Sequence, residues 1–189
     1  MQPSGVPPVD PGRWARQQPP SYLKRPFKEA NVGRQAEKYH LSLAGEFYVA
    51  AELQRRCIAA AVTYGNAKKA DVVAISSGSY AVAIEVKSTP GPRWVVGGSV
   101  PQPSTAPWVF VHIPPTATEA PTFYVLSQAQ LYDILHPVDV AYRTNYLAKH
   151  NEEYGDRRGV VNLSREQAAP FKDQWATIID LLKAIAPSE

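Results

Sequence analysis

Apolar side chains recur every three or four positions between residues 42 and 61, which is the spacing of one helical face. This stripe consists of Leu43, Phe47, Ala50, Leu53, Cys57, Ile58 and Ala61. Ser42 stands just before it and can cap the first turn. The pattern therefore predicts a helix over residues 42–61 with Cys57 on its buried face.

Alternating patterns follow this helix. Residues 71–75 form a short β-type run, and residues 80–87 alternate with a period of two. Residues 76–79 between them are typical of a hairpin turn. One face of the second run carries Tyr80, Val82, Ile84 and Val86, and the other carries Ala81, Ala83, Glu85 and Lys87. We therefore expect an antiparallel hairpin, and the apolar runs at 108–113 and 123–126 predict two further strands.

The C-terminal part indicates helices. Ser127 is expected to cap a helix that ends at Leu135, because a proline follows at position 137. Residues 138–162 are polar, and a short helix near 143–150 is compatible with them. Ser164 opens a capping box, and a helical stripe to cover the core is formed by Phe171, Trp175, Ile178, Ile179, Leu182 and Ile185. The order of elements predicts an α/β or α+β domain with a central mixed β-sheet flanked by helices.

Prolines and basic residues are unevenly distributed. Residues 1–41 carry a net charge of +4 and seven of the 18 prolines, whereas residues 42–189 carry −1. This composition predicts a flexible, proline-rich basic arm over residues 1–41 and a single domain with a C-terminal helical extension over residues 42–189. The arm is either a solvated tail or a contact for phosphates or a protein partner. A second proline cluster predicts a long ordered loop at 88–106.

The composition excludes several classes of protein. The single cysteine, Cys57, cannot form an internal disulfide, and this favours a reducing compartment. No apolar run approaches the roughly 18 residues that a membrane span needs. The first residues lack the charged start and apolar stretch of a secretory signal. We therefore expect a cytoplasmic protein without a membrane partner.

Three acidic residues and one lysine are awkward for a purely structural interpretation. Glu46 falls on the helix face that should be buried, where a carboxylate is costly unless it is paired or binds a metal. Asp71 opens a hydrophobic strand, and the hairpin can place it on the face that Glu85 and Lys87 share. Simpler interpretations stay open: Glu46 can complement the helix dipole, Asp71 can serve a turn, and Glu85 with Lys87 can form an exposed ion pair.

The ordered set of these residues resembles the PD-(D/E)XK nuclease superfamily. Asp71 is followed after thirteen residues by Glu85-Val86-Lys87, and Gly45-Glu46 on the preceding helix matches the first motif of that superfamily. The resemblance covers roughly residues 42–126 and is greatest to Holliday-junction-resolvase-like and restriction-endonuclease-like branches. Ala70 stands where the superfamily's name has a proline. The resemblance implies a restriction-endonuclease-like core.

The resemblance also implies roles for the site residues. Asp71 and Glu85 would bind Mg²⁺, with Mn²⁺ as a substitute, assisted by the backbone carbonyl of Val86. Lys87 would orient or help deprotonate the attacking water and stabilise the transition state. Glu46 would contact the metal through water or support a second ion.

Nucleic-acid contacts are expected next to these residues. Ser88 could hold a phosphate, Arg93 could contact another, and Trp94 could stack on a base, although Trp94 is equally suited to anchor the core. The resulting hypothesis is a Mg²⁺-dependent DNA endonuclease that works as a homodimer, with RNA as an open alternative substrate. A second hypothesis is a catalytically inactive nuclease-like scaffold that binds protein or nucleic acid.

Overall fold

The computed structural model describes residues 34–63, 70–76, 80–116, 118–157 and 159–185 of the chain. Most of the predicted N-terminal arm lies outside these residues. Backbone contacts divide the chain into Met1–Ala36 and Glu37–Glu189, and the second unit contains the β-sheets. Among the described residues, no helix is long and apolar enough to cross a membrane.

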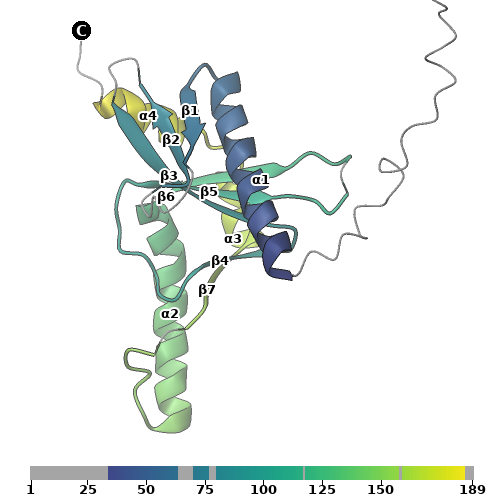
Figure 1. Ribbon diagram of the computed structural model, residues 1–189. Helices are drawn as coiled ribbons and strands as arrows, with labels where there is room; N and C mark the ends of the chain where they lie inside the picture. The colour runs from purple at the N-terminus through teal and green to yellow at the C-terminus, as the bar shows by residue number, and fades with distance from the viewer. Residues whose placement is uncertain (1–33, 64–69, 77–79, 117, 158, 186–189) are drawn as a thin grey trace, which may run out of the picture. The chain divides into compact units, whose positions relative to one another are not determined.

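A five-stranded mixed sheet organises the unit Glu37–Glu189 (Figure 1). Its strands are β1 (Ala59–Val62), β2 (Val72–Ile75), β3 (Ala81–Thr89), β5 (Pro107–His112) and β6 (Thr122–Ser127), and the spatial order is β1-β2-β3-β5-β6. The pair β3–β5 is parallel, whereas β1–β2, β2–β3 and β5–β6 are antiparallel. The prediction of a central mixed sheet flanked by helices is therefore confirmed.

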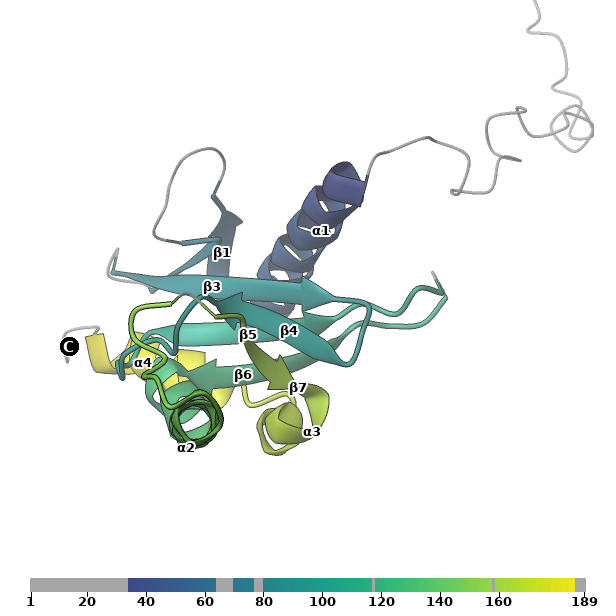
Figure 2. The same ribbon diagram turned by 90° about the horizontal axis from the view of Figure 1, so that it is seen from below.

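Alternation along β3 assigns the two faces of the sheet. Val82, Ile84 and Val86 are buried in a core cluster with residues of helices α1 (Arg34–Arg55) and α4 (Ala176–Ile185). On the opposite face, β5 and β6 are covered by helix α2 (Gln128–His150), by helix α3 (Arg165–Ala168), and by a separate sheet of β4 (Arg93–Gly97) and β7 (Val161–Ser164). Ala81 and Ala83 of β3 are exposed on this face. Figure 2 shows α1 on one side of the sheet and α2 and α3 on the other.

Helix α1 approaches the sheet through a glycine. Gly45 is buried, and a Cβ atom placed on it would lie 1.7 Å from the Oγ atom and 2.9 Å from the Cβ atom of Ser88 on β3. Such distances are far below van der Waals contact, so only glycine allows this approach. The helix backbone therefore rests directly on β3 at this point.

Both ends of α1 differ from the prediction. The helix begins at Arg34, so residues 34–41 of the predicted arm are helical and Ser42 does not cap the first turn. The helix stops at Arg55, and Cys57 adopts a left-handed conformation (φ 59°) with an exposed side chain. The amide of Ile58 donates to the Leu53 carbonyl (3.0 Å), and that of Cys57 donates to the Gln54 carbonyl (2.9 Å), which is the pattern of a Schellman motif. The prediction that Cys57 is buried is wrong. Residues 59–61, expected in the helix, belong to β1 because pairing with β2 outweighs local propensity.

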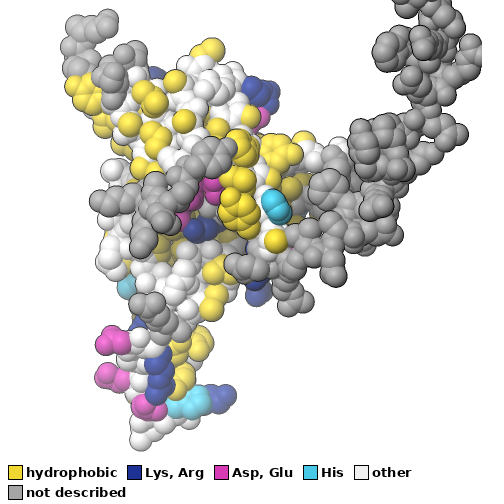
Figure 3. Space-filling model, in the orientation of Figure 1, with side chains coloured by type: hydrophobic (Ala, Val, Ile, Leu, Met, Phe, Trp, Pro, Cys, Tyr) yellow, Lys and Arg dark blue, Asp and Glu magenta, His cyan; other side chains and the backbone are white. Residues whose placement is uncertain are grey.

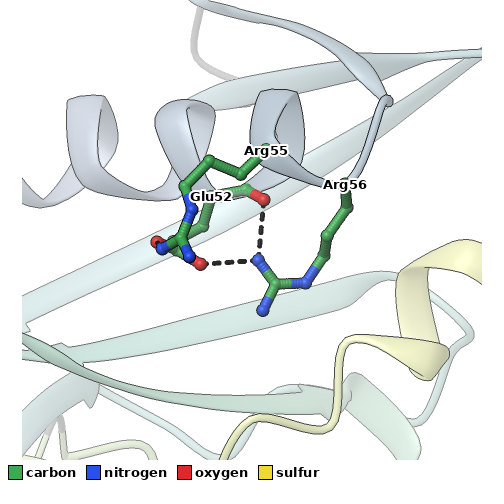
Figure 4. A network of polar contacts seen from close by, with 3 residues as sticks. All are labelled: Glu52, Arg55 and Arg56. Atoms are coloured by element: carbon green, nitrogen blue, oxygen red, sulfur yellow. Dashed lines mark hydrogen bonds and ion pairs between the residues drawn. The ribbon is translucent and has the colours of Figure 1, made fainter.

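A charge network closes the last turn of α1. Arg55 and Arg56 each form an ion pair of 2.5 Å with Glu52 (Figure 4). The Arg56 guanidinium also lies 4.5 Å from the ring centroid of Trp175, which is buried just before α4. This cation–π contact connects the end of α1 to the C-terminal helix.

Helix α2 also corrects the sequence-based prediction. Its capping box at Ser127 and Gln130 begins it as expected, but the helix continues through Pro137 to His150. A proline has no N–H group, so the carbonyl four residues before it loses its helical hydrogen bond. Pro137 is exposed, and this carbonyl can bind water instead. No residue of α2 beyond Leu135 is buried. Contacts of Tyr142 and Tyr146 with Tyr154 hold this outer half against the segment that follows.

The strand pair β4–β7 was not predicted. Residues 93–97 fall within the expected loop, and residues 161–164 overlap the end of the polar segment 138–162, which the pattern did not assign to a strand. The residues that pair between β4 and β7 are more than sixty positions apart in sequence, and local patterns do not reveal such a pairing. The strands at 71–75, 80–87, 108–113 and 123–126 are confirmed, with small shifts, as β2, β3, β5 and β6. Ser164 forms its capping box, and the C-terminal helix begins at Ala176, after a 3-10 turn at Ala169–Phe171.

Replacing Gly45 by alanine tests the contact between α1 and β3. We expect Gly45→Ala to lower the free energy of unfolding by about 1–3 kcal/mol, because overpacking forces the helix away from the sheet. Adding Ser88→Ala should restore part of the loss and Ser88→Gly more of it, since they remove first one and then both clashing atoms. Urea denaturation measures the effect. A more stable Gly45→Ala protein, as helix propensity alone would give, would contradict this account.

Candidate active site

Asp71 precedes β2 at the edge of β3. Its amide donates to the Ile84 carbonyl (3.0 Å), and its Oδ2 atom accepts a hydrogen bond from the Val86 amide (2.7 Å). The β2–β3 ladder ends at the pair of Val72 and Ile84, so the Asp71 side chain occupies the next position along the edge of β3. Because the N–H and C=O groups of a strand residue point to the same side, the Val86 carbonyl faces this edge as well.

Glu85 and Lys87 lie side by side on β3, as the period of two predicts. The Lys87 ammonium donates to Glu85 Oε1. The Lys87 side chain is 30% exposed and the Glu85 side chain is 35% exposed. The ammonium also lies 5.6 Å from the centroid of the Trp108 ring on β5. The pair is therefore open to solvent on one side and bounded by an aromatic ring on the other.

Glu46 reaches the same region from α1. Its side chain is partly buried, and its Oε1 atom accepts a hydrogen bond from Ser42 (3.4 Å) one turn earlier. The charges of Asp71, Glu85 and Lys87 all act on it. In Figure 3, acidic side chains emerge beside a basic one on the face next to α1. The structure thus brings together the four residues that the sequence singled out.

The pKa values of two of these carboxyl groups are raised. For Glu46, burial is the main cause and the negative charge of Asp71 adds to it, while the Ser42 hydrogen bond acts in the opposite direction. For Asp71, burial again raises the pKa, and the charge of Glu85 adds to it; the Val86 amide partly offsets both. The cluster thus holds negative charges that repel one another.

The donor chemistry of this cluster fits a hard divalent cation. Carboxylate oxygens are the preferred ligands of Mg²⁺, and a cation would stabilise the charged carboxylates against the burial and repulsion that raise their pKa values. Within the part of the chain that the structure describes, no three or more His, Cys, Asp or Glu residues are already arranged as a metal cage. This agrees with the usual Mg²⁺ site, which keeps several waters and uses one or two carboxylates.

The structure separates the three residues expected to contact nucleic acid. Trp94 is a core residue: it is 1% exposed, its indole N–H donates to the Val111 carbonyl (2.9 Å), and it packs against Phe110 and Tyr124. It is therefore unavailable to stack on a base. The Ser88 Oγ atom is buried beneath Gly45, so it is not accessible to a phosphate. Arg93 alone is exposed.

Arg93 lines a separate cavity of about 620 Å³ between α2, β4 and β7. Its other lining residues include Tyr142, Arg143 and Asn162, and none of the four clustered site residues lines it. Arg143 is engaged by Asp139 (2.7 Å) and by the Gly155 carbonyl (3.0 Å). The positive charges of the lining residues are cancelled by an equal number of negative ones, so this cavity does not resemble a phosphate channel.

Trp108 belongs to the site but was not expected there. Its backbone is the register partner of Glu85 across the parallel β3–β5 pair. A sequence pattern predicts that residues 108–113 form a strand, but it does not reveal which strand they pair with. No signal in the sequence would therefore have placed this ring over Lys87.

Comparisons with known proteins give a weak structural similarity. No protein-family model and no curated protein matches the chain. The structure is similar to the solved structure of Hjc from Archaeoglobus fulgidus, a Holliday junction resolvase from an archaeal hyperthermophile. The TM-score is 0.42 at 16% sequence identity, and the match covers 72% of this chain and 94% of that one. The functional argument therefore relies on the site residues themselves.

Neutralising Glu46 should make the protein more stable at neutral pH. A carboxyl group whose pKa is raised on folding stabilises the protein fully only below its unfolded pKa, here about the ordinary 4.5, and loses that contribution as pH rises through the folded value. Glu46→Gln removes this penalty. Thermal unfolding should therefore show a higher Tm than wild type at pH 7 and a smaller difference at pH 4.

The exposed Glu153 provides the matched control for this comparison. Glu153→Gln should leave the pH dependence of Tm close to that of wild type. A Glu46→Gln protein that is less stable than wild type at pH 7 would show that the carboxylate is a stabilising group rather than a strained one.

Proposed function

We propose that this protein is a Mg²⁺-dependent nuclease that hydrolyses DNA phosphodiester bonds as an endonuclease. The observation that supports this most is the convergence of Glu46, Asp71, Glu85 and Lys87 at one edge of β3. They come from α1, from the residue before β2, and from β3 itself. Partly buried carboxylates with raised pKa values beside a lysine are typical of sites whose function offsets their cost in stability.

Each residue has a distinct proposed role. Asp71 and Glu85, with the Val86 carbonyl, would hold Mg²⁺ or Mn²⁺, and Glu46 would contact it through water. The cation would neutralise charge that develops on the phosphate. Lys87 would orient the attacking water and stabilise the negative transition state, since its ammonium is partly exposed beside the carboxylates.

The proposed partner is DNA, and RNA remains an open alternative. Residues 42–189 carry a net charge of −1, so strong binding to a polyanion requires a local basic surface or a second subunit. A homodimer is proposed on the family resemblance. A cytoplasmic location is proposed on the single cysteine, and a protein partner for the N-terminal arm on its proline-rich, basic composition. Arg93 would lie outside the reacting centre, because it lines the separate cavity.

An inactive nuclease-like scaffold is the second candidate. Its supporting observation is that residues 42–189 carry a net charge of −1, which does not favour binding to a polyanion. In such a protein the ion pair of Glu85 and Lys87 would be purely structural. The two candidates differ in whether removal of one site residue abolishes the chemistry or leaves the biological effect intact.

Plasmid cleavage in Mg²⁺ and in Mn²⁺ distinguishes them. Wild type should nick or linearise the plasmid, whereas Asp71→Ala and Lys87→Ala should reduce the rate by about 10²-fold or more, since each removes a group proposed to act on the reacting atoms. Chelation of the metal should abolish cleavage.

Two further measurements make this experiment decisive. Glu153→Gln, on the exposed segment after α2, should cut at the wild-type rate. Circular dichroism should show that the Asp71 and Lys87 variants remain folded. Equal rates for wild type and Asp71→Ala would identify a contaminating nuclease and count against the proposal.

A further inference from the structure

We propose that Trp108 is a positioning residue for Lys87, and that it connects the start of α2 to the reacting centre. This inference rests on the proposed function, because Lys87 is its proposed catalytic lysine. Trp108 itself would touch neither metal nor phosphate. Its role would be to hold the ammonium group where it can act on water or on the scissile phosphate.

The geometry of the Lys87 side chain carries the argument. Its Nζ atom has two neighbours of different kinds: the Glu85 carboxylate and the face of the Trp108 ring, whose centroid is 5.6 Å away. A tryptophan face is the most favourable aromatic partner for a cation within about 6 Å. A lysine side chain has four rotatable bonds, so two anchors greatly reduce the positions its ammonium can occupy.

Trp108 is itself fixed by ring stacking, by a side-chain hydrogen bond and by the pairing of its backbone. It is only 9% exposed, and it stacks on Phe110 with an interplanar angle of 16° and a centroid distance of 5.9 Å. Its indole N–H donates to the side-chain carbonyl of Gln128, the first residue of α2 (3.1 Å). Parallel pairing places its backbone opposite Glu85. Such a ring cannot turn away from Lys87 without breaking the bond to α2.

Gln128, which binds the Trp108 ring, is in turn hydrogen-bonded to the proline-containing segment before β5. The Gln128 amide group donates to the Gln102 carbonyl, and its backbone N–H donates to the Ala106 carbonyl (2.8 Å). The next amide, that of Ala129, donates to the Ser104 carbonyl (2.9 Å). Residues 102–106 are thus fixed to the first turn of α2, and through Gln128 and Trp108 they support the lysine.

A double-mutant cycle on DNA cleavage tests the functional part. Trp108→Leu removes the ring face and should lower kcat about 5- to 30-fold with little change in KM, a range that corresponds to the strength of a partly buried cation–π contact. Trp108→Phe keeps a weaker face and should lose less. In a Lys87→Ala background, Trp108→Leu should change the residual rate less than twofold, because the group it positions is gone.

A matched control separates this effect from a general loss of packing. Trp175 is also a buried tryptophan, 4% exposed, but it packs against Phe123 and Arg56 rather than Lys87. Trp175→Leu, assayed at a temperature where it remains folded, should retain wild-type kcat. Equal reductions by Trp108→Leu with and without Lys87, or equal losses from both tryptophans, would overturn the positioning role.

A spectroscopic measurement tests the contact without any need for activity. Lysines reductively methylated with ¹³C-formaldehyde and a borohydride keep their charge and give separate NMR signals, and Lys87→Arg identifies the signal of Lys87. A methyl group over an indole face should be shifted upfield from those of exposed lysines, in wild type and in part in Trp108→Phe, but not in Trp108→Leu. A wild-type Lys87 signal at the exposed position would overturn the proposal. A shifted signal in a protein that cuts no DNA would instead support the contact and contradict the proposed function.

Discussion

The close approach of α1 to β3 at Gly45 is the constraint on which the rest of the site depends. The helix contributes Glu46, the residue next to this glycine, and the sheet contributes the other three groups. If the helix were displaced by even the radius of a methyl group, Glu46 would move away from Asp71 and the electrostatic coupling between them would weaken. Ser88 sits beneath the glycine, where its hydroxyl is buried and has no hydrogen-bond partner among the residues that the structure describes. The chain thus accepts an unpaired polar atom at the point of contact.

A second feature of the site is that it is costly for the fold. Ordinary packing would place apolar side chains where α1 meets the end of the β2–β3 ladder. This protein instead places Glu46 and Asp71 there, both partly buried and both with raised pKa values. The remainder of the unit offsets this cost by burying apolar side chains in two core clusters on opposite faces of the sheet. Functional sites are commonly unfavourable for stability, and the well-packed remainder of the protein offsets their cost.

Local patterns predicted those parts of the fold that local interactions determine. The alternation in residues 80–87 places Glu85 and Lys87 on one face, and the hairpin places Asp71 beside them. Helical spacing was also enough to direct Glu46 toward the sheet. The roles of these residues in catalysis stay predictions, whereas their proximity is observed.

The errors arose where distant parts of the chain decide the structure. Cys57 ends α1 in a left-handed turn, and the run at 59–62 becomes a strand only because β2 is available. Trp94 lies in the core because β4 pairs with β7, and Trp108 reaches Lys87 because β5 lies parallel to β3. The continuation of α2 through Pro137 depends on its exposed position and on tyrosine contacts with a later segment. None of these pairings has a signature in a single sequence.

Calorimetric titration with Mn²⁺ tests the central claim most directly, because it asks whether the clustered carboxylates form a cation site. At mildly acidic pH, carboxyl groups with raised pKa values retain part of their protons, and a cation that binds them must displace those protons. Titrations in two buffers of different ionisation enthalpy would measure that release. The account predicts saturable binding with net proton release that decreases in Glu46→Gln and Asp71→Asn. Absence of binding in the folded wild-type protein, or binding that both variants leave unchanged, would contradict it.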